Sequence, residues 1–252
     1  MVELAGVVRP PAWDYVGTGL AGTRIQLCGR LVVSVDGRRV EAELPGRQGR
    51  VLLSFLALNR MRTLTRDEAV EALWPEGRDG GLAPLLSKLR RVVELDGLRL
   101  DADWVDVEAA TEALHRAESA LAQGDPHGAW GPSQVAMFVT GRPLLPDEGA
   151  AWIDAERRRL DGLHVRALEA YAAAALGVGG TELAAAVRAG RKLVEREPYR
   201  ESGYRILMEA LDREGNSAEA LIVYDALRTR LRDDLGISPN DATQAVHRRL
   251  LR

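Results

Sequence analysis

The stretch from Thr65 to Arg91, TRDEAVEALWPEGRDGGLAPLLSKLRR, predicts two short helices joined by a glycine-rich turn. Thr65 is a favourable N-cap, and Glu68 three residues later completes the capping-box pattern that opens a helix. Pro75–Gly77 ends the first helix, and Asp79–Gly81 supplies the turn before the second. A helix, a tight turn and a second helix form the arrangement with which many proteins enter the DNA major groove.

The second of these helices has one apolar face and one polar face. At 100° per residue, its apolar side chains fall within an arc of roughly 120°. Ser87 and Arg91 point away from this arc, and Lys88 and Arg90 flank it. An outward Ser/Lys/Arg face suits contact with DNA, although an ordinary helical hairpin with a solvated face explains the same pattern. The apolar positions are Leu82, Leu85, Leu86, Leu89, Val92 and Val93.

The composition is that of a soluble globular protein that is long enough for two domains. The chain has 252 residues, of which 46% are hydrophobic and 28% are charged. Cys28 is the one cysteine, which excludes an internal disulfide and fits a reducing compartment. No signal-peptide pattern opens the chain, and glycines and Glu182 interrupt the alanine-rich run Tyr171–Val187. We therefore expect a cytoplasmic protein without membrane contact.

The charge is unevenly distributed, although the net charge is only −3. Residues 24–100 carry 14 Lys/Arg against 10 Asp/Glu, a balance of +4, whereas residues 101–252 carry 19 against 25, a balance of −6. A basic front part followed by an acidic rear part is typical of a nucleic-acid-binding module attached to a second module.

Before the two helices, residues 24–44 show a β pattern. Ile25 and Leu27 alternate with polar neighbours, and Asp36-Gly37 is a two-residue hairpin signal between apolar runs. We expect three short strands in a small antiparallel sheet, covered on one face by an apolar helix over Arg50–Asn59.

No recognised catalytic, cofactor or metal pattern is present. Met1–Thr23 is expected to be a flexible leader. Its Gly17-x-Gly19-x-x-Gly22 spacing lacks the preceding strand and following helix of a dinucleotide site. The sequence contains no P-loop, no HExxH motif and no paired cysteines, so we expect no enzyme activity, no cofactor and no metal. The histidines are scattered and are expected to be surface helix residues: His115, His127, His164 and His247.

The rear part is predicted to be helical throughout, with short Gly/Pro turns that favour antiparallel pairs. Thr181–Gly215 and Ser217–Leu250 each have the two-helix layout of a tetratricopeptide-type unit. An α-solenoid-like domain of this kind usually offers a surface for other proteins. The expected helices are Asp106–Gln123, Ala129–Thr140 (interrupted by Pro132), Ala150–Leu176, Glu182–Arg196, Glu201–Arg213, Ala218–Asp234 and Asp241–Leu251.

Several strings, in this order, resemble those of the Streptomyces antibiotic regulatory protein (SARP) family of transcriptional activators. They are GRLVVSVDGRRV, LTRDEAVEALWPE, LSKLRR, DVEAATEALHRAESALAQGD, GRPLL, AEALIVYDALRTRLRDDLGISP and HRRLL, and they cover nearly everything after Arg24. The string LRDDLGISP with HRRLL close behind it is the most specific. The resemblance implies a mainly α fold with a small antiparallel β-sheet. An OmpR-like winged helix-turn-helix domain would cover residues 24–103. A bacterial transcriptional activator domain, tetratricopeptide-like, would cover residues 104–252.

The chain departs from the family pattern in two places. Ala83, Pro84 and Leu85 stand where the family usually carries polar or basic residues in its DNA-reading helix. The segment Glu94–Asp103 is also too short for a normal wing hairpin, and we expect one short strand there, around Leu98 and Leu100.

The resemblance implies a DNA-binding transcriptional regulator, and more specifically an activator. Its partners would be promoter DNA, RNA polymerase or another protein through the helical domain, and a second copy in a homodimer. The two departures leave open the alternative of a protein-interaction adaptor that has kept the fold but lost strong DNA binding. Ser87, Lys88 and Arg91 are expected to face the groove. The expected phosphate contacts are Arg47, Arg50, Arg66 and Arg99, together with Lys88 and Arg91.

Overall fold

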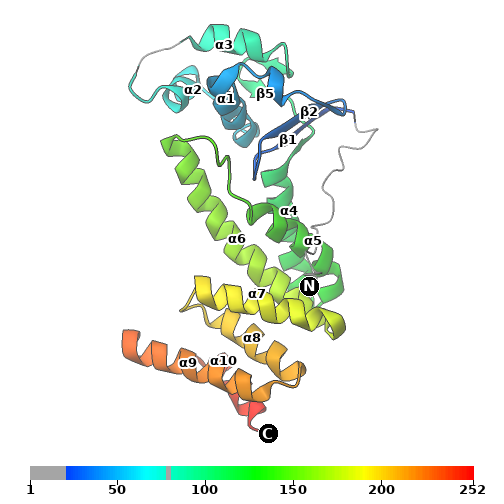
Figure 1. The fold of residues 1–252 in the computed structure, drawn as a ribbon, viewed down its shortest axis with the longest axis vertical. Helices are drawn as coiled ribbons and strands as arrows, with labels where there is room; N and C mark the ends of the chain where they lie inside the picture. Colours follow the sequence, from blue (N-terminus) through cyan, green and yellow to red (C-terminus); the bar gives the residue numbers. More distant parts are fainter. Residues whose placement is uncertain (1–20, 78–80) are drawn as a thin grey trace, which may run out of the picture. The chain divides into compact units, whose positions relative to one another are not determined.

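The computed structural model describes residues 21–77 and 81–252 and divides into two compact units (Figure 1). The first unit contains the described residues up to Asp106 together with Leu145–Ile153, and the second contains Val107–Leu144 and Asp154–Arg252. The expected leader lies outside the described residues up to position 20, and so do the first two glycines of its Gly-x-Gly-x-x-Gly spacing. A strand already begins at Thr23.

A mixed sheet lies in the first unit. Asp36 and Gly37 have φ values of 50° and 79° and join two antiparallel strands, which confirms the predicted two-residue hairpin. A fourth strand was not predicted, because Trp104–Val105 is too short to show an alternating pattern. This strand pairs in parallel with the first, whereas the other pairs are antiparallel. The strands are β1 (Thr23–Gln26), β2 (Val32–Val35), β3 (Arg38–Arg39) and β6 (Trp104–Val105), in the order β3-β2-β1-β6.

Helix α1 (Gly46–Leu58) supplies much of the core of this unit and packs against α2 (Arg66–Leu73) and α3 (Leu82–Leu89). It is preceded by a short 3-10 helix, η1 (Glu41–Glu43). The predicted helix over Arg50–Asn59 is confirmed and begins one turn earlier. Its residues from Val51 to Ala57 are all buried, as its almost wholly apolar sequence requires.

The second helix of the opening stretch is shorter than predicted. α3 ends at Leu89, although its predicted apolar positions continue to Val93. From there the backbone continues in tighter turns, in which the Arg91 N–H donates to the Lys88 carbonyl at 3.2 Å. Val93 beyond these turns is still buried, so the apolar face extends past the regular helix.

The wing is a minimal hairpin rather than the single strand that was predicted. Its strands are β4 (Leu95–Asp96) and β5 (Arg99–Leu100), which pair antiparallel. Gly97 has a φ of 61° and forms the two-residue loop with Leu98, so Leu98 lies in the turn. A glycine at this position makes so short a connection possible, because positive φ is costly for other residues.

A segment from much later in the chain, Leu145–Ile153, belongs to the first unit. The Leu145 N–H donates to the Leu27 carbonyl at 3.0 Å. The Trp152 indole N–H donates to the Ala72 carbonyl at 3.1 Å, and its ring meets Phe55 edge-on at 5.3 Å between centroids. The expected limits of residues 24–103 did not include this segment, because no local pattern marks contacts between residues so far apart.

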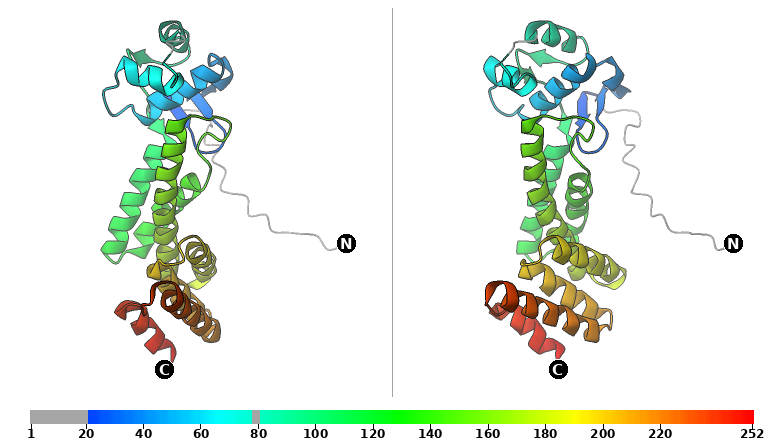
Figure 2. Two further views of the ribbon diagram at one scale, coloured as in Figure 1. Left: turned by 90° about the vertical axis from the view of Figure 1, so that its left-hand side faces the viewer. Right: turned by 60° about the vertical axis from the view of Figure 1, so that its left-hand side comes forward.

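The second unit consists of helices that pack pairwise, α7 on α8, α8 on α9 and α10 on α8 (Figure 2). The fold class is confirmed: the chain is mainly α, with small sheets in a winged-helix part. Most helix limits lie within one or two residues of those predicted. The helices are α4 (Asp106–Ala122), α5 (Pro126–Thr140), α6 (Ala151–Val178), α7 (Leu183–Arg196), α8 (Glu201–Arg213), α9 (Ser217–Leu235) and α10 (Asp241–Leu250), with a 3-10 turn, η2 (Gly180–Glu182).

Pro132 does not interrupt its helix, contrary to the sequence-based expectation. α5 runs continuously through it, with Asp125 capping the N-terminus by accepting from the Gly128 N–H at 2.8 Å. Ala129, Ala136 and other residues of α5 are buried, and this packing offsets the hydrogen bond that the proline cannot donate. Of the helices in the described ranges, none has the length and apolar composition that a bilayer span requires.

His164 on α6 is half-buried rather than a surface residue as expected. The Thr140 hydroxyl lies 2.7 Å from the Ala136 carbonyl, to which it donates, and 3.0 Å from His164 Nδ1. The hydroxyl can therefore accept from an Nδ1–H of His164, which fits a ring that carries a proton on that nitrogen. Burial lowers the pKa of His164 below its ordinary value of 6.5, and the positive charge of Arg196 acts in the same direction.

This pKa shift makes stability depend on pH. Below pH 6.5 the unfolded chain binds a proton at His164 that the folded chain resists, so the free energy of unfolding falls as the pH falls through 6.5. We expect His164→Gln to flatten this dependence in urea unfolding measured between pH 5 and pH 7.5. An unchanged pH dependence in the variant would show that another group causes it.

Candidate nucleic-acid interface

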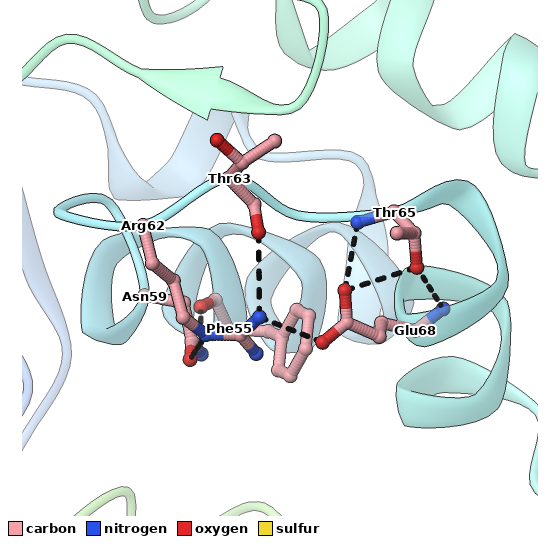
Figure 3. A network of polar contacts seen from close by, with 6 residues as sticks. All are labelled: Phe55, Asn59, Arg62, Thr63, Thr65 and Glu68. Atoms are coloured by element: carbon pink, nitrogen blue, oxygen red, sulfur yellow. Dashed lines mark hydrogen bonds and ion pairs between the residues drawn. The ribbon is translucent and has the colours of Figure 1, made fainter.

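The start of α2 is built by a capping box, as the sequence predicted (Figure 3). The Thr65 hydroxyl accepts from the Glu68 N–H at 3.3 Å, and the Glu68 carboxylate accepts from the Thr65 N–H at 2.7 Å. The Thr65 hydroxyl also donates to this carboxylate at 2.9 Å. The Thr65 N–H and the Arg62 guanidinium lower the pKa of Glu68 to about 2, so this carboxylate is ionised at neutral pH.

Arg62 connects this cap to the end of α1 (Figure 3). Its guanidinium donates to Glu68 at 2.6 Å and to the Asn59 side-chain oxygen at 2.9 Å, while the Asn59 amide donates to the Phe55 carbonyl at 2.8 Å. The ion pair between Arg62 and Glu68 is exposed, so it adds little to the stability of the fold. Its consequence is geometric, because it links the end of one helix to the beginning of the next. The sequence analysis missed Arg62, since a contact across an irregular loop has no periodic signature.

The turn before α3 ends at Gly81, whose φ of 104° lies in the region that favours glycine. This residue is the N-cap of α3 and contributes no side-chain cap. A different residue here would be strained, which explains the glycine at the end of the predicted turn.

α3 has the two faces that the sequence predicted. Leu82, Leu85, Leu86 and Leu89 are buried within the first unit. Ser87, Lys88 and Arg91 are exposed, and their side chains make no hydrogen bond or ion pair with any residue that the structure describes. Their polar groups are therefore available to a partner.

Ala83 and Pro84 are exposed on the same helix. The first turn of α3 thus offers solvent an apolar surface, whereas the turns that follow offer a hydroxyl and two cations. The departure from the family pattern at these positions lies on the surface and is not compensated by a polar neighbour in the first turn of the helix.

Two further predicted residues are exposed beside these elements. Arg66 is the first residue of α2, and Arg99 lies in β5 of the wing. Both therefore belong to elements of a helix-turn-helix with a short wing. Their predicted role as phosphate contacts remains a prediction.

Arg47 and Arg50 have a different environment. Both lie near the start of α1 and hold the Glu148 carboxylate, Arg47 Nε at 3.0 Å and Arg50 Nε at 2.9 Å. Only 4% of the Glu148 side chain is exposed, so this carboxylate is buried against the two guanidinium groups. The pairing neutralises part of the charge that the two arginines would offer a phosphate, although 64% of the Arg47 side chain remains exposed. Their DNA role also remains a prediction.

The described residues contain no group of three or more His, Cys, Asp or Glu side chains that could hold a metal ion. The first unit instead contains α3, whose buried face is formed by leucines and whose exposed side carries a hydroxyl and cations. Such groups can contact both the phosphates and the base edges of a nucleic acid.

The comparison with known families agrees with this chemistry. The family model described as the bacterial transcriptional activator domain matches residues 105–251, and the chain therefore belongs to this family. The chain is also similar to the regulators AfsR, RedD and EmbR, and this similarity confirms the resemblance to SARP-type regulators seen in the sequence.

The chain is 30% identical over 218 residues to the regulatory protein AfsR of Streptomyces griseus, which covers 81% of this chain and 22% of AfsR. It is 28% identical over 248 residues to the transcriptional regulator RedD of Streptomyces coelicolor, covering 87% of this chain and 68% of RedD. The chain therefore spans only about a fifth of the length of AfsR.

A solved structure, Mycobacterium tuberculosis EmbR in complex with a low affinity phosphopeptide, matches with a TM-score of 0.74. The match has 25% sequence identity and covers 91% of this chain and 65% of the EmbR chain. The similarity therefore extends over both units and is not limited to the helical one.

Proposed function

We propose that this protein is a DNA-binding transcriptional regulator, and specifically an activator, whose helical unit mediates contacts with other proteins. The observation that carries the proposal is the outward face of α3 and the turn after it, where the Ser87, Lys88 and Arg91 side chains make no hydrogen bond or ion pair with the residues that the structure describes. Lysine and arginine there can neutralise phosphates, and the hydroxyl and ammonium groups can reach base edges. The names of the relatives, which are regulatory proteins and transcriptional regulators, support the proposal.

The remaining cations divide into two groups. We propose that Arg66 and Arg99 contact phosphates from the start of α2 and from the wing, since both are exposed on these elements. Arg47 and Arg50 would contribute less, because Glu148 already neutralises part of their charge. The wing is too short to reach far, so α3 would supply most of the binding free energy.

We further propose that the protein works in the cytoplasm, without catalytic activity, and that its helical unit contacts RNA polymerase, another protein or a second copy of the chain. The support is the tetratricopeptide-like stacking of α7, α8, α9 and α10, since such helix pairs commonly form protein-binding surfaces. The alternative of an adaptor without DNA binding is less well supported. The relatives named as regulators favour the regulator over this alternative.

Removing the cations Lys88 in α3 and Arg91 just after it is the direct test. In Lys88→Ala/Arg91→Ala, we expect retention of sheared genomic DNA to fall, and the affinity difference from the parent protein to be largest at low salt. We also expect the slope of log affinity against log salt for a retained fragment to lose about 1 to 2, because each lost phosphate contact removes about 0.9.

A matched control is Arg188→Ala/Lys192→Ala on α7. This variant removes the same formal charge from two exposed positions of the second unit, whose side chains make no hydrogen bond or ion pair within the described part of the chain. We expect this variant to bind DNA like the parent protein. If the α3 variant binds DNA with unchanged affinity and salt slope, the assignment of this face to DNA is incorrect. If the parent protein retains no DNA at low salt but captures a protein partner, the adaptor alternative is favoured.

A further inference from the structure

The outward face of α3 changes its chemistry along the helix. At 100° per residue, the exposed residues of α3 fall within an arc of about 140° that lies opposite the buried leucines; they are Ala83, Pro84, Ser87 and Lys88. The N-terminal part of the arc has only the Ala83 methyl group and the Pro84 ring. The C-terminal part has the Ser87 hydroxyl and the Lys88 ammonium, and the exposed Arg91 follows two residues after the end of the helix. One continuous surface thus has an apolar beginning and a polar end.

The apolar beginning occupies the position that normally reads bases. In a helix-turn-helix, the N-terminal residues of the second helix contact base edges in the major groove. Neither Ala83 nor Pro84 has a side-chain donor or acceptor, and Pro84 also lacks a backbone N–H. In that groove, the base feature that an apolar side chain can recognise is the C5-methyl group of thymine.

On the basis of the proposed function, we infer that the first turn of α3 recognises a thymine methyl group through Ala83 and Pro84. Polar readout is then confined to Ser87 and Lys88, one turn later. The four-residue separation of Ala83 and Ser87 corresponds to about 6 Å along the helix, or about two base-pair steps. The preferred DNA site therefore carries a methyl-dependent thymine about two base pairs from the base that Ser87 or Lys88 contacts.

The inference can be tested by removing only the methyl group. The full chain is used to select duplexes from a random library, and each thymine of the selected site is then replaced in turn by deoxyuridine. This replacement leaves every hydrogen-bonding group of the base in place. At one position we expect affinity to fall about fourfold, the effect of one buried methyl group. Replacement of the other thymines should change affinity little.

A variant locates the contact on the protein. Ala83→Gly removes the methyl group on the protein side, so we expect it to bind the thymine and uracil duplexes more nearly equally. Ala218→Gly is the matched control, because Ala218 is likewise the exposed second residue of its helix, α9. It should preserve the full preference for thymine. The uracil series uses the unmodified protein and does not depend on either variant folding.

The outcomes separate this inference from the proposed function. If DNA is bound with the expected salt dependence but no uracil replacement weakens binding, the methyl contact is absent and the regulator assignment stands. If no duplex is selected even at low salt, both fail. If Ala218→Gly changes the thymine preference as much as Ala83→Gly, the contact does not lie on α3.

Discussion

Asp106→Ala is expected to lower the free energy of unfolding of the first unit by about 3 kcal/mol, because it leaves two buried backbone donors without their acceptor, each at about 1–3 kcal/mol. The Asp106 carboxylate is fully buried and accepts from the Leu27 and Cys28 N–H groups, each at 2.9 Å. These donors directly follow β1, and Asp106 directly follows β6. The carboxylate therefore adds two hydrogen bonds between the chain segments that directly follow the parallel strands β1 and β6.

Two matched variants sharpen this prediction in urea unfolding followed by tryptophan fluorescence. Asp106→Asn keeps the shape but has one carbonyl oxygen, so one N–H would face an amide NH2 group, and we expect an intermediate loss. Asp101→Ala removes an exposed carboxylate from the loop between β5 and β6 and should change the free energy of unfolding by less than about 0.5 kcal/mol. Equal stability of Asp106→Ala and Asp101→Ala would contradict the structural role given to Asp106.

Trp152→Ala is expected to lower the free energy of unfolding by about 2–3 kcal/mol, the second large effect. Truncating a fully buried aromatic side chain costs about 3–5 kcal/mol, and Trp152 is only half-buried. The variant loses the edge-on contact with Phe55 and the hydrogen bond to the Ala72 carbonyl in α2. Hydrogen exchange should therefore become faster in α2 more than in α8 of the second unit.

Trp152→Phe separates the two contributions. It keeps an aromatic ring against Phe55 but loses the indole donor, so about 1 kcal/mol of the loss should remain. If exchange in α2 is the same in the parent protein and in Trp152→Ala, the segment Leu145–Ile153 does not hold this helix.

The prediction for Trp152 follows from the fact that the first unit is formed by two separate segments of the chain. Its sheet and helices come from the front of the chain, but Glu148 and Trp152 come from a segment inside the region that the activator-domain model matches. Glu148 holds Arg47 and Arg50, and Trp152 holds α2. A front fragment that ends near residue 106 would lack these partners.

The sequence by itself determined the local elements of this protein. The capping box at Thr65, the Asp36-Gly37 hairpin, the two faces of α3 and the limits of most rear helices were all predicted correctly. Each of these depends on residues within one or two turns of each other, and hydrophobic periodicity and turn chemistry report such short-range effects directly. The outward Ser87, Lys88 and Arg91 were predicted for the same reason.

Only the tertiary structure decided the features that depend on distant residues. It paired Trp104–Val105 with β1, buried Glu148 between two arginines, and held His164 against Thr140. It also kept α5 helical through Pro132, because burial of the surrounding residues outweighs one missing hydrogen bond. Contacts that span from 24 to 101 positions have no periodic signature, since they arise from how folded elements pack and not from the order of neighbouring residues.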